Sequence, residues 1–213
     1  MRVANEHQVF NDDVLTTFGI EKRTLVSSVN HVYNLFDSVD TTLIANGGVP
    51  LGELVELANL SAIVGNVFRS GLIKHSSGLF VENLPHTFPD LLSTKQGVPS
   101  LEIKVCLEQN NPKGHLVKPG PHMILRYVLA QKNGQYKLGK ENRGVVPYFW
   151  EIKLGFLTES HFNVSNTVGD SGKTAVINKD GLENLSTVFF DKRMFPYSRV
   201  GSTFKRYSGL FSS

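Results

Sequence analysis

The segment from residue 88 to 105 holds the residue types that phosphodiester hydrolysis needs. Pro89 and Asp90 fall on a loop or at the start of a strand, and Glu102 and Lys104 follow inside an alternating strand pattern. Side chains two residues apart point to the same face of a strand, so Glu102 and Lys104 are expected side by side. If Asp90 lies on the neighbouring strand or at its entrance, its carboxylate converges on that of Glu102.

Two converging carboxylates form a suitable site for Mg²⁺, because this ion prefers carboxylate and water oxygens. The ion would polarise a phosphodiester and stabilise the departing oxyanion. A lysine beside it can hold the attacking water and favour its deprotonation electrostatically. The segment therefore predicts a magnesium-dependent hydrolytic site built from Asp90, Glu102 and Lys104.

The run Pro89-Asp90 followed by Glu102-Ile103-Lys104 resembles the signature of the PD-(D/E)xK nuclease superfamily. That superfamily includes most type II restriction endonucleases and the mismatch-repair nicking endonucleases. The resemblance implies that Asp90 and Glu102 bind Mg²⁺ and that Lys104 is the catalytic lysine.

The same resemblance covers about residues 48–130 and implies a mixed β-sheet core flanked by helices. It also implies an acidic metal ligand on a helix that precedes the motif. The sequence offers Glu56 for this role, with Glu53 as the alternative, and the helix pattern does not separate the two.

A second acid-x-lysine triplet, Glu151-Ile152-Lys153, occurs on another expected strand. Such short triplets recur by chance, so the triplet alone carries little information. This copy has no Pro-Asp shortly before it, and we interpret it as an ordinary strand with a solvated face. The competing interpretation of the first copy is similar: a surface strand with an exposed Glu–Lys pair that contributes little to stability.

Helices are expected in the first part of the chain. Asn11 precedes a short helix, and a second helix after Thr24 places an apolar stripe on one face. Pro50 is expected to start a third helix, buried on more than one side. The residues of the stripe are Leu25, Val29, Val32, Tyr33 and Phe36, and those of the third helix are Leu51, Leu54, Val55 and Ala58.

From residue 72 the pattern changes to short apolar runs separated by turn residues. A hairpin is expected over 72–81, and strands over 100–107, 123–130, 148–157 and 173–177, with a tight turn at Asn133-Gly134 and another turn over 169–172. A last helix, capped by Asn178 or Asp180, is expected to carry Leu182, Leu185 and Phe189. The fold class is therefore α/β or α+β in a single domain of 213 residues, comprising a helical region over 1–47, a catalytic core over 48–130 and a basic aromatic segment over 192–213.

Positive charge gathers in two segments although the net charge of the chain is only +3. Residues 112–144 carry seven Lys or Arg against one acid, a local charge of +6, and the segment from 192 to 206 carries five and no acid. Loops of this kind can contact a phosphate backbone or base edges, and interleaved aromatic side chains can stack on bases. The candidate DNA-binding residues are Asn110, Asn111, Lys113, His115, Lys118, Arg199, Lys205 and Arg206. Solvated lysines in the first segment, and a tail that docks on the fold or on a second subunit in the last, are the competing interpretations.

The composition limits the remaining possibilities. A single cysteine, Cys106, excludes a disulfide within the chain and any zinc site made of several cysteines, and fits a reducing compartment. No apolar run reaches the ~18 residues that a membrane span needs, so a cytoplasmic protein without membrane contact is expected. The sequence therefore predicts a Mg²⁺-dependent endonuclease of the restriction type that acts on double-stranded DNA as a homodimer. A nicking nuclease of repair or recombination, or a non-catalytic DNA-binding protein on the same scaffold, are the alternatives.

Overall fold

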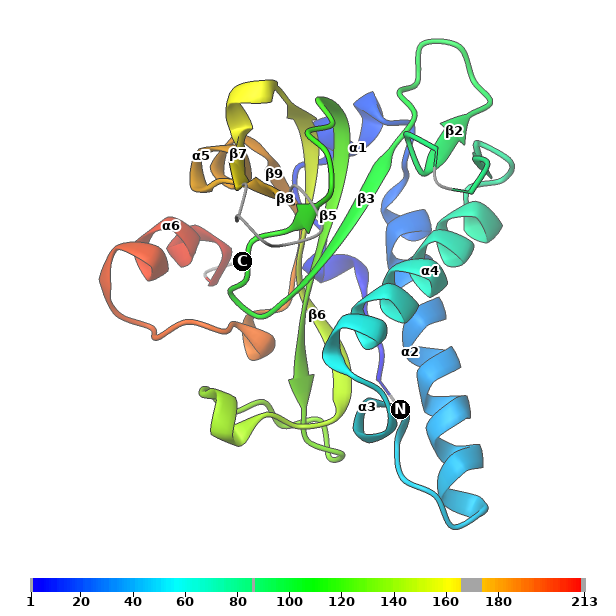
Figure 1. The fold of residues 1–213 in the computed structure, drawn as a ribbon, viewed down its shortest axis with the longest axis vertical. Helices are drawn as coiled ribbons and strands as arrows, with labels where there is room; N and C mark the ends of the chain where they lie inside the picture. The colour runs from blue at the N-terminus through cyan, green and yellow to red at the C-terminus, as the bar shows by residue number, and fades with distance from the viewer. Residues whose placement is uncertain (1, 86, 166–173, 212–213) are drawn as a thin grey trace.

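The computed structural model describes residues 2–85, 87–165 and 174–211 (Figure 1). Its helices are α1 (Asp12–Thr17), α2 (Lys22–Ala45), α3 (Leu51–Leu54), α4 (Leu57–His75), α5 (Lys179–Asn184) and α6 (Gly201–Phe211). Its strands are β1 (Phe80–Glu82), β2 (Leu91–Ser93), β3 (Glu102–Leu107), β4 (Lys113–Gly114), β5 (Gly120–Ala130), β6 (Val146–Leu157), β7 (Phe162–Ser165), β8 (Thr174–Ile177) and β9 (Ser186–Phe190).

A mixed sheet with the strand order β3-β5-β6-β9 forms the centre of the molecule. β3 runs parallel to β5, whereas β5–β6 and β6–β9 are antiparallel pairs. β4, β8 and β7 form a second sheet, and β1 and β2 form a separate hairpin that an isolated bridge between Leu91 and Leu101 joins to the chain just before β3. The fold is therefore α+β with a helix-flanked mixed sheet, which confirms the fold class that the sequence predicts.

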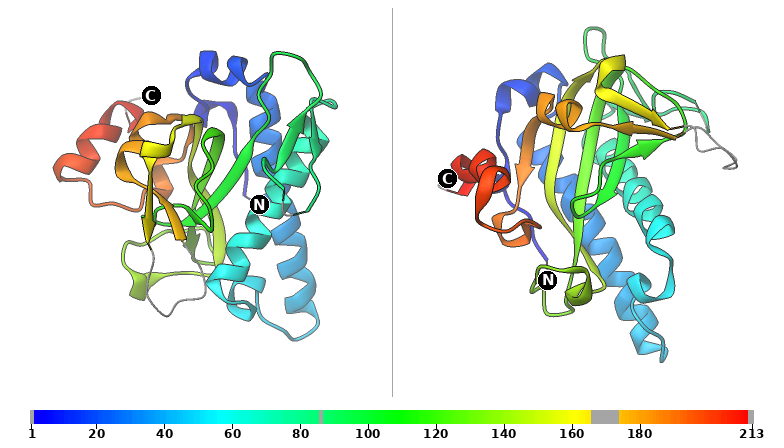
Figure 2. Two further views of the ribbon diagram at one scale, coloured as in Figure 1. Left: turned by 45° about the horizontal axis from the view of Figure 1, so that its top comes forward. Right: turned by 60° about the vertical axis from the view of Figure 1, so that its left-hand side comes forward.

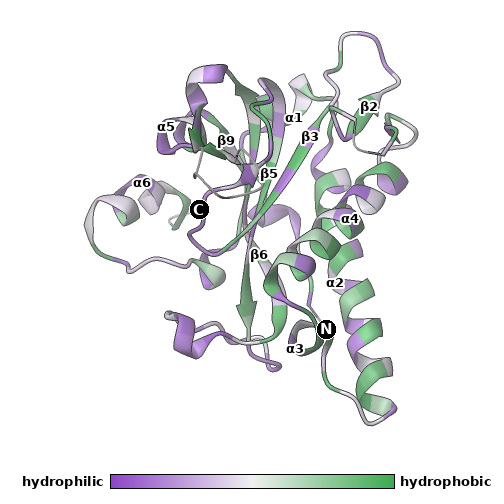
Figure 3. Ribbon diagram, in the orientation of Figure 1, coloured by the Kyte–Doolittle hydropathy of each residue, from purple (hydrophilic) through white to green (hydrophobic). Residues whose placement is uncertain are grey.

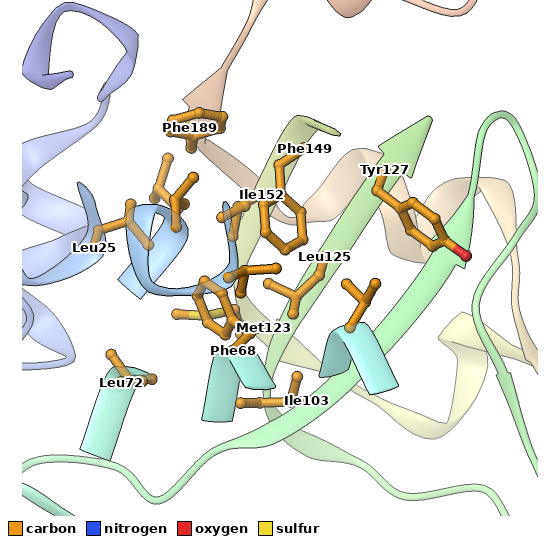
Figure 4. Close-up of a cluster of buried hydrophobic side chains, with 14 of the residues drawn as sticks. Leu25, Phe68, Leu72, Ile103, Met123, Leu125, Tyr127, Phe149, Ile152 and Phe189 are labelled. Atoms are coloured by element: carbon orange, nitrogen blue, oxygen red, sulfur yellow. The ribbon is translucent and has the colours of Figure 1, made fainter. Parts of the chain in front are cut away.

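Helices α2 and α4 cover one face of the central sheet (Figure 1). The whole stripe predicted for α2 is buried, as 3.6-residue periodicity requires of a helix packed on a core. α4 approaches β3 closely at Gly65, where an added Cβ would lie 2.8 Å from Val105 Cγ2. Side chains from both helices and from β3, β5 and β6 fill the space between them, as Phe68, Met123 and Ile152 do in Figure 4.

The opposite face of the central sheet carries α5, the second sheet and α6 (Figures 1 and 2). Apolar side chains of α5 and β8 pack there against Ile124 and Cys106. The segment after β9 brings an aromatic cluster against the buried Trp150, and α6 adds Tyr207 and Phe211 to it. In Figure 3, α6 is mixed in hydropathy, as expected of a helix that packs through one side only.

Two expected elements in the first half of the chain differ from the structure. Residues 72–75 are the last turn of α4 and not a hairpin strand, because Leu72 continues the four-residue spacing of the buried Val64 and Phe68. The third helix is interrupted at Val55 and Glu56, which are extended, and this leaves Leu54 and Ala58 exposed. It is therefore not a continuous buried helix.

The end of the chain also departs from the expected pattern. Asn178 caps α5, as predicted, by accepting a hydrogen bond from Gly181 N, but the helix ends at Asn184 and Phe189 lies on β9. A local turn forms at Asn133-Gly134, where Gly134 has φ +81°. The connection from β5 to β6 is nevertheless long, because β6 begins only at Val146. The turn expected over 169–172 lies outside the described residues.

No helix in the described part of the chain combines the length and the apolar character that crossing a membrane requires.

Candidate active site

A cleft of about 950 Å³ brings the motif residues together. Asp90 enters it from the start of β2, and Glu102 and Lys104 enter it from β3. The other charged or titratable side chains that line it are Arg69, Glu82, His115 and Lys118. Asp90, Glu102 and Lys104 therefore line the same cleft.

Glu102 lies at the floor of the cleft and is fully buried. Its Oε1 atom accepts hydrogen bonds from Lys104 Nζ and, at 2.9 Å, from Lys118 Nζ. Its Oε2 atom is buried and has no hydrogen-bond partner among the described residues. Burial disfavours the charged carboxylate, but the two ammonium groups outweigh burial and hold the pKa of Glu102 below its ordinary value.

Asp90 is fixed from two sides. Its Oδ2 accepts a 2.8 Å hydrogen bond from Ile103 N, which ties it to the motif strand. Its Oδ1 accepts a 3.2 Å hydrogen bond from Arg69, a residue of α4. An arginine of the preceding helix thus stands beside Asp90, where the resemblance implies an acidic residue.

Neither helix glutamate that the sequence offers reaches this cleft. Glu56 is the residue before α4, and twelve helical residues lie between it and Arg69, so the helix rises by about 20 Å from one to the other. Glu53 lies on α3 and forms an ion pair of 3.3 Å with Lys132. Because α4 continues to His75, its end and not its beginning borders the cleft, and the assignment of Glu56 or Glu53 as a metal ligand is wrong for this structure.

Only two of the five candidate DNA-binding residues after β3 line the cleft. His115 and Lys118 line the cleft, and Lys118 also lies over the ring of Phe88 at 5.3 Å. Asn111 instead lines a separate cavity of about 300 Å³ beside α6. The other two, Asn110 and Lys113, are exposed and do not line the cleft.

The second triplet is buried, which contradicts the solvated face expected for it. Glu151 is fully buried and accepts hydrogen bonds from Arg126 Nη1 at 2.9 Å and Thr187 Oγ1 at 2.7 Å. Tyr207 of α6 donates another at 3.1 Å. Lys153 donates to Leu185 O at 2.8 Å. The copy lies on a strand in the middle of the sheet, so both of its faces are covered.

The C-terminal basic residues are also placed differently from the DNA surface suggested for them. Arg199 lies over the ring of Phe211 at 5.3 Å, and Arg206 contacts Glu183. Lys205 is exposed, and none of the three lines the cleft. The aromatic side chains of this segment pack on the chain's own core, which agrees with the alternative of a docked tail.

Much of the positive charge of residues 112–144 is neutralised within the molecule. Lys118 is paired with Glu102, Arg126 with Glu151 and Arg143 with Glu108. Lys132 is paired with Glu53. A count of charges along the chain therefore overstates the basic surface, because acids from distant segments fold against these cations.

The sequence does not predict two residues that lie beside the motif, one next to Asp90 and one next to Glu102. Arg69 was hidden because the end of α4 reads as a turn and hairpin. His122 is the register partner of Glu102 on β5 and is fully buried. Its position two residues into a long apolar strand is the signal that could have placed it beside the motif.

The residues present suit Mg²⁺, which commonly uses only one or two carboxylates and takes its remaining ligands from water and substrate. The unpartnered Oε2 of Glu102 supports this assignment. No cluster of three or more His, Cys, Asp or Glu side chains suited to a metal ion occurs in the residues that the structure describes. A protein-only ligand set of the three-acid kind is therefore not formed there.

A comparison of the chain with protein-family models and with curated proteins finds no match.

Proposed function

We propose that the protein is a divalent-metal-dependent endonuclease of the restriction type, which hydrolyses double-stranded DNA at a specific sequence and acts as a homodimer. One observation carries the proposal: Asp90, Glu102 and Lys104 line a single cleft, and Glu102 Oε2 has no hydrogen-bond partner among the described residues. A bound Mg²⁺ would supply the positive charge that stabilises the departing oxyanion.

The protein's own groups have distinct tasks in this proposal. Asp90 and Glu102 would hold the ion, and the hydrogen bond from Ile103 N keeps Asp90 aimed at the strand that carries Glu102. Lys104 is one-fifth exposed toward the cleft, so it can hold the attacking water while its stem stays packed. Arg69 and Lys118 also line the cleft and would contact DNA phosphates beside the reacting one.

Plasmid cleavage tests the proposal. The wild-type chain should convert supercoiled DNA into discrete fragments with Mg²⁺ or Mn²⁺ and leave it intact with EDTA. Asp90→Asn, Glu102→Gln and Lys104→Met should each lower the rate by ~100-fold or more while duplex binding persists. Glu82→Gln is the matched control, because Glu82 lines the same cleft but is largely exposed. Wild-type cleavage by the three variants would refute the assignment, and nicked circles alone would favour the nicking alternative.

A non-catalytic DNA-binding role is the second candidate, and one observation favours it. Arg69 forms an ion pair with Asp90, and Lys104 and Lys118 form ion pairs with Glu102. Cations of the protein itself therefore already neutralise both motif carboxylates. Duplex binding that is unaffected by EDTA, with no cleavage in Mg²⁺ or Mn²⁺, would support this candidate against the first.

A further inference from the structure

Glu102, which lines the cleft, is paired in register with the neighbouring residue His122. They are register partners on β3 and β5, so their side chains point to the same face of the sheet. Both are fully buried. Within the described part of the chain, Glu102 Oε2 and His122 Nε2 have no hydrogen-bond partner.

The unpartnered nitrogen of His122 is an acceptor. His122 Nδ1 lies 3.0 Å from Gly120 O, and because a carbonyl oxygen only accepts, Nδ1 carries the proton. With Nδ1–H donating to this carbonyl, Nε2 of the neutral ring keeps its lone pair. An imidazole held in this way by a backbone carbonyl is arranged as metal-binding histidines are.

Glu102 Oε2 and His122 Nε2 are therefore two buried acceptors without a donor among the described residues. Leaving such acceptors unpaired costs free energy, unless a cation or a water molecule binds between them. A carboxylate oxygen with an imidazole nitrogen is a ligand set for Mn²⁺, Co²⁺ or Zn²⁺, whereas Mg²⁺ prefers oxygen alone. Lys104 and Lys118 both bind Oε1, so Oε2 is the oxygen left for a cation.

We propose that Glu102 Oε2 and His122 Nε2 together bind one divalent transition-metal ion, so that His122 supplies a nitrogen ligand beside Glu102. The inference rests on the proposed function in one respect, the assignment of Glu102 as a metal ligand. It goes further by assigning the metal class: an ion that accepts nitrogen should bind more tightly than Mg²⁺.

Pulsed electron paramagnetic resonance of bound Mn²⁺ tests the nitrogen directly. The intact wild-type chain with one equivalent of Mn²⁺ should show the coupling of a directly bound ¹⁴N nucleus. Labelling the histidines with ¹⁵N should replace this signal by the ¹⁵N pattern. Bound Mn²⁺ without nitrogen coupling would overturn the proposal and indicate that water bridges the two atoms.

Matched variants assign the nitrogen to one residue. His122→Asn keeps an amide that can donate to Gly120 O but has no atom at the position of Nε2. It should lose the nitrogen coupling and bind Mn²⁺ roughly tenfold more weakly, with little change in weak Mg²⁺ binding. His115→Asn is the control, since His115 is the histidine that lines the cleft with Glu102, and it should retain the coupling. Loss of the signal in His115→Asn and its retention in His122→Asn would overturn the assignment.

Glu102→Gln separates this inference from the proposed function. If Glu102 binds no metal, Mn²⁺ affinity will be the same in Glu102→Gln and wild type, and both proposals about the site fail. If the affinity falls in Glu102→Gln but the wild type shows no nitrogen coupling, only the assignment of His122 fails. Should His122→Asn not fold, the isotope experiment on the wild-type chain still decides the question.

Discussion

At the scale of single residues, the two oxygens of Glu102 have different surroundings. Oε1 receives two ammonium groups, and Oε2 receives nothing from the described residues. An ion at Oε2 therefore feels the attraction of the carboxylate and the repulsion of Lys104 and Lys118. The strength of cation binding depends on this balance, and one of the two lysines can be removed without touching the motif.

Lys118→Met should raise the affinity of the cleft for Mn²⁺ by roughly tenfold at low salt, because it removes a positive charge near the ion. Raising the ionic strength should shrink the gain, since salt screens charges at the cleft surface. Calorimetric titration measures the change, and Lys118→Arg is the control that keeps the charge. An unchanged or weaker affinity in Lys118→Met would place the ion away from Glu102.

His31 makes the stability of the protein depend on pH. It lies on α2 against His75 of α4, with 5.8 Å between the ring centroids, and burial followed by repulsion from Lys74 and His75 lowers its pKa from 6.5. The unfolded chain therefore binds a proton near pH 6.5 that the folded chain takes up only at lower pH. The free energy of unfolding should fall as pH falls through this range.

His31→Asn should reduce the part of that loss that arises between pH 7.5 and pH 5.5. Urea unfolding at the two pH values measures the difference, with His7→Asn as a control, because His7 is an exposed histidine. The same pH-dependent loss in His31→Asn and wild type would contradict the prediction.

At the scale of elements, the close approach of α4 to β3 fixes the position of the cleft. A Cβ at Gly65 would lie 2.8 Å from Val105 Cγ2, so any larger residue forces the Val105 side chain or the helix to shift. Asp90 depends on this spacing, since Arg69 of α4 and Ile103 of β3 each hold one of its oxygens.

Gly65→Ala should destabilise the protein by about 1–3 kcal/mol, because overpacking outweighs the gain in helix propensity. In a Val105→Ala background the same change should become neutral or stabilising, since the clashing methyl group is gone and only the propensity remains. Urea unfolding of the four chains gives the coupling free energy. Equal effects of Gly65→Ala in both backgrounds would show that the contact does not control the packing.

The elements also show what the sequence can predict. The stripe of α2 and the alternation of β3 were predictable, because each has one buried face and a clear period. The end of α4 was not, because His75-Ser76-Ser77-Gly78 reads as a hairpin turn when it is the exit of a helix. That error hid Arg69 and left Glu56 and Glu53 as the only helix acids to consider.

At the scale of the whole molecule, one face of the central sheet carries both acid-x-lysine triplets. Glu102 lines the cleft together with its partners Lys104 and Lys118. The carboxylate of Glu151 is instead enclosed by Arg126, Thr187 and Tyr207. Spacing along the chain cannot distinguish them, since both alternate correctly. The edge position of β3 and the central position of β6 distinguish them, and strand order is a property of the complete fold.

The two triplets should respond oppositely to the same substitution. Glu151→Gln should cost roughly 3–5 kcal/mol, because it leaves Arg126 buried without its charge partner, while residual folded protein keeps its cleavage rate. Glu102→Gln should cost less stability, since both lysines can reach water, but should lose cleavage. Urea unfolding and plasmid assays at low temperature measure both. Cleavage lost only in Glu151→Gln would move the active site to the second triplet.

The docked C-terminal segment makes Trp150, the single tryptophan of the chain, an optical reporter. Its indole is fully buried, Tyr207 of α6 lies edge-on at 5.8 Å, and Arg126 stacks over it at 4.3 Å. Release of α6 would expose the indole to water while the helices on the other face stay packed. A red shift in fluorescence that precedes the loss of helical circular dichroism during a urea titration would therefore report undocking of this segment as a separate step.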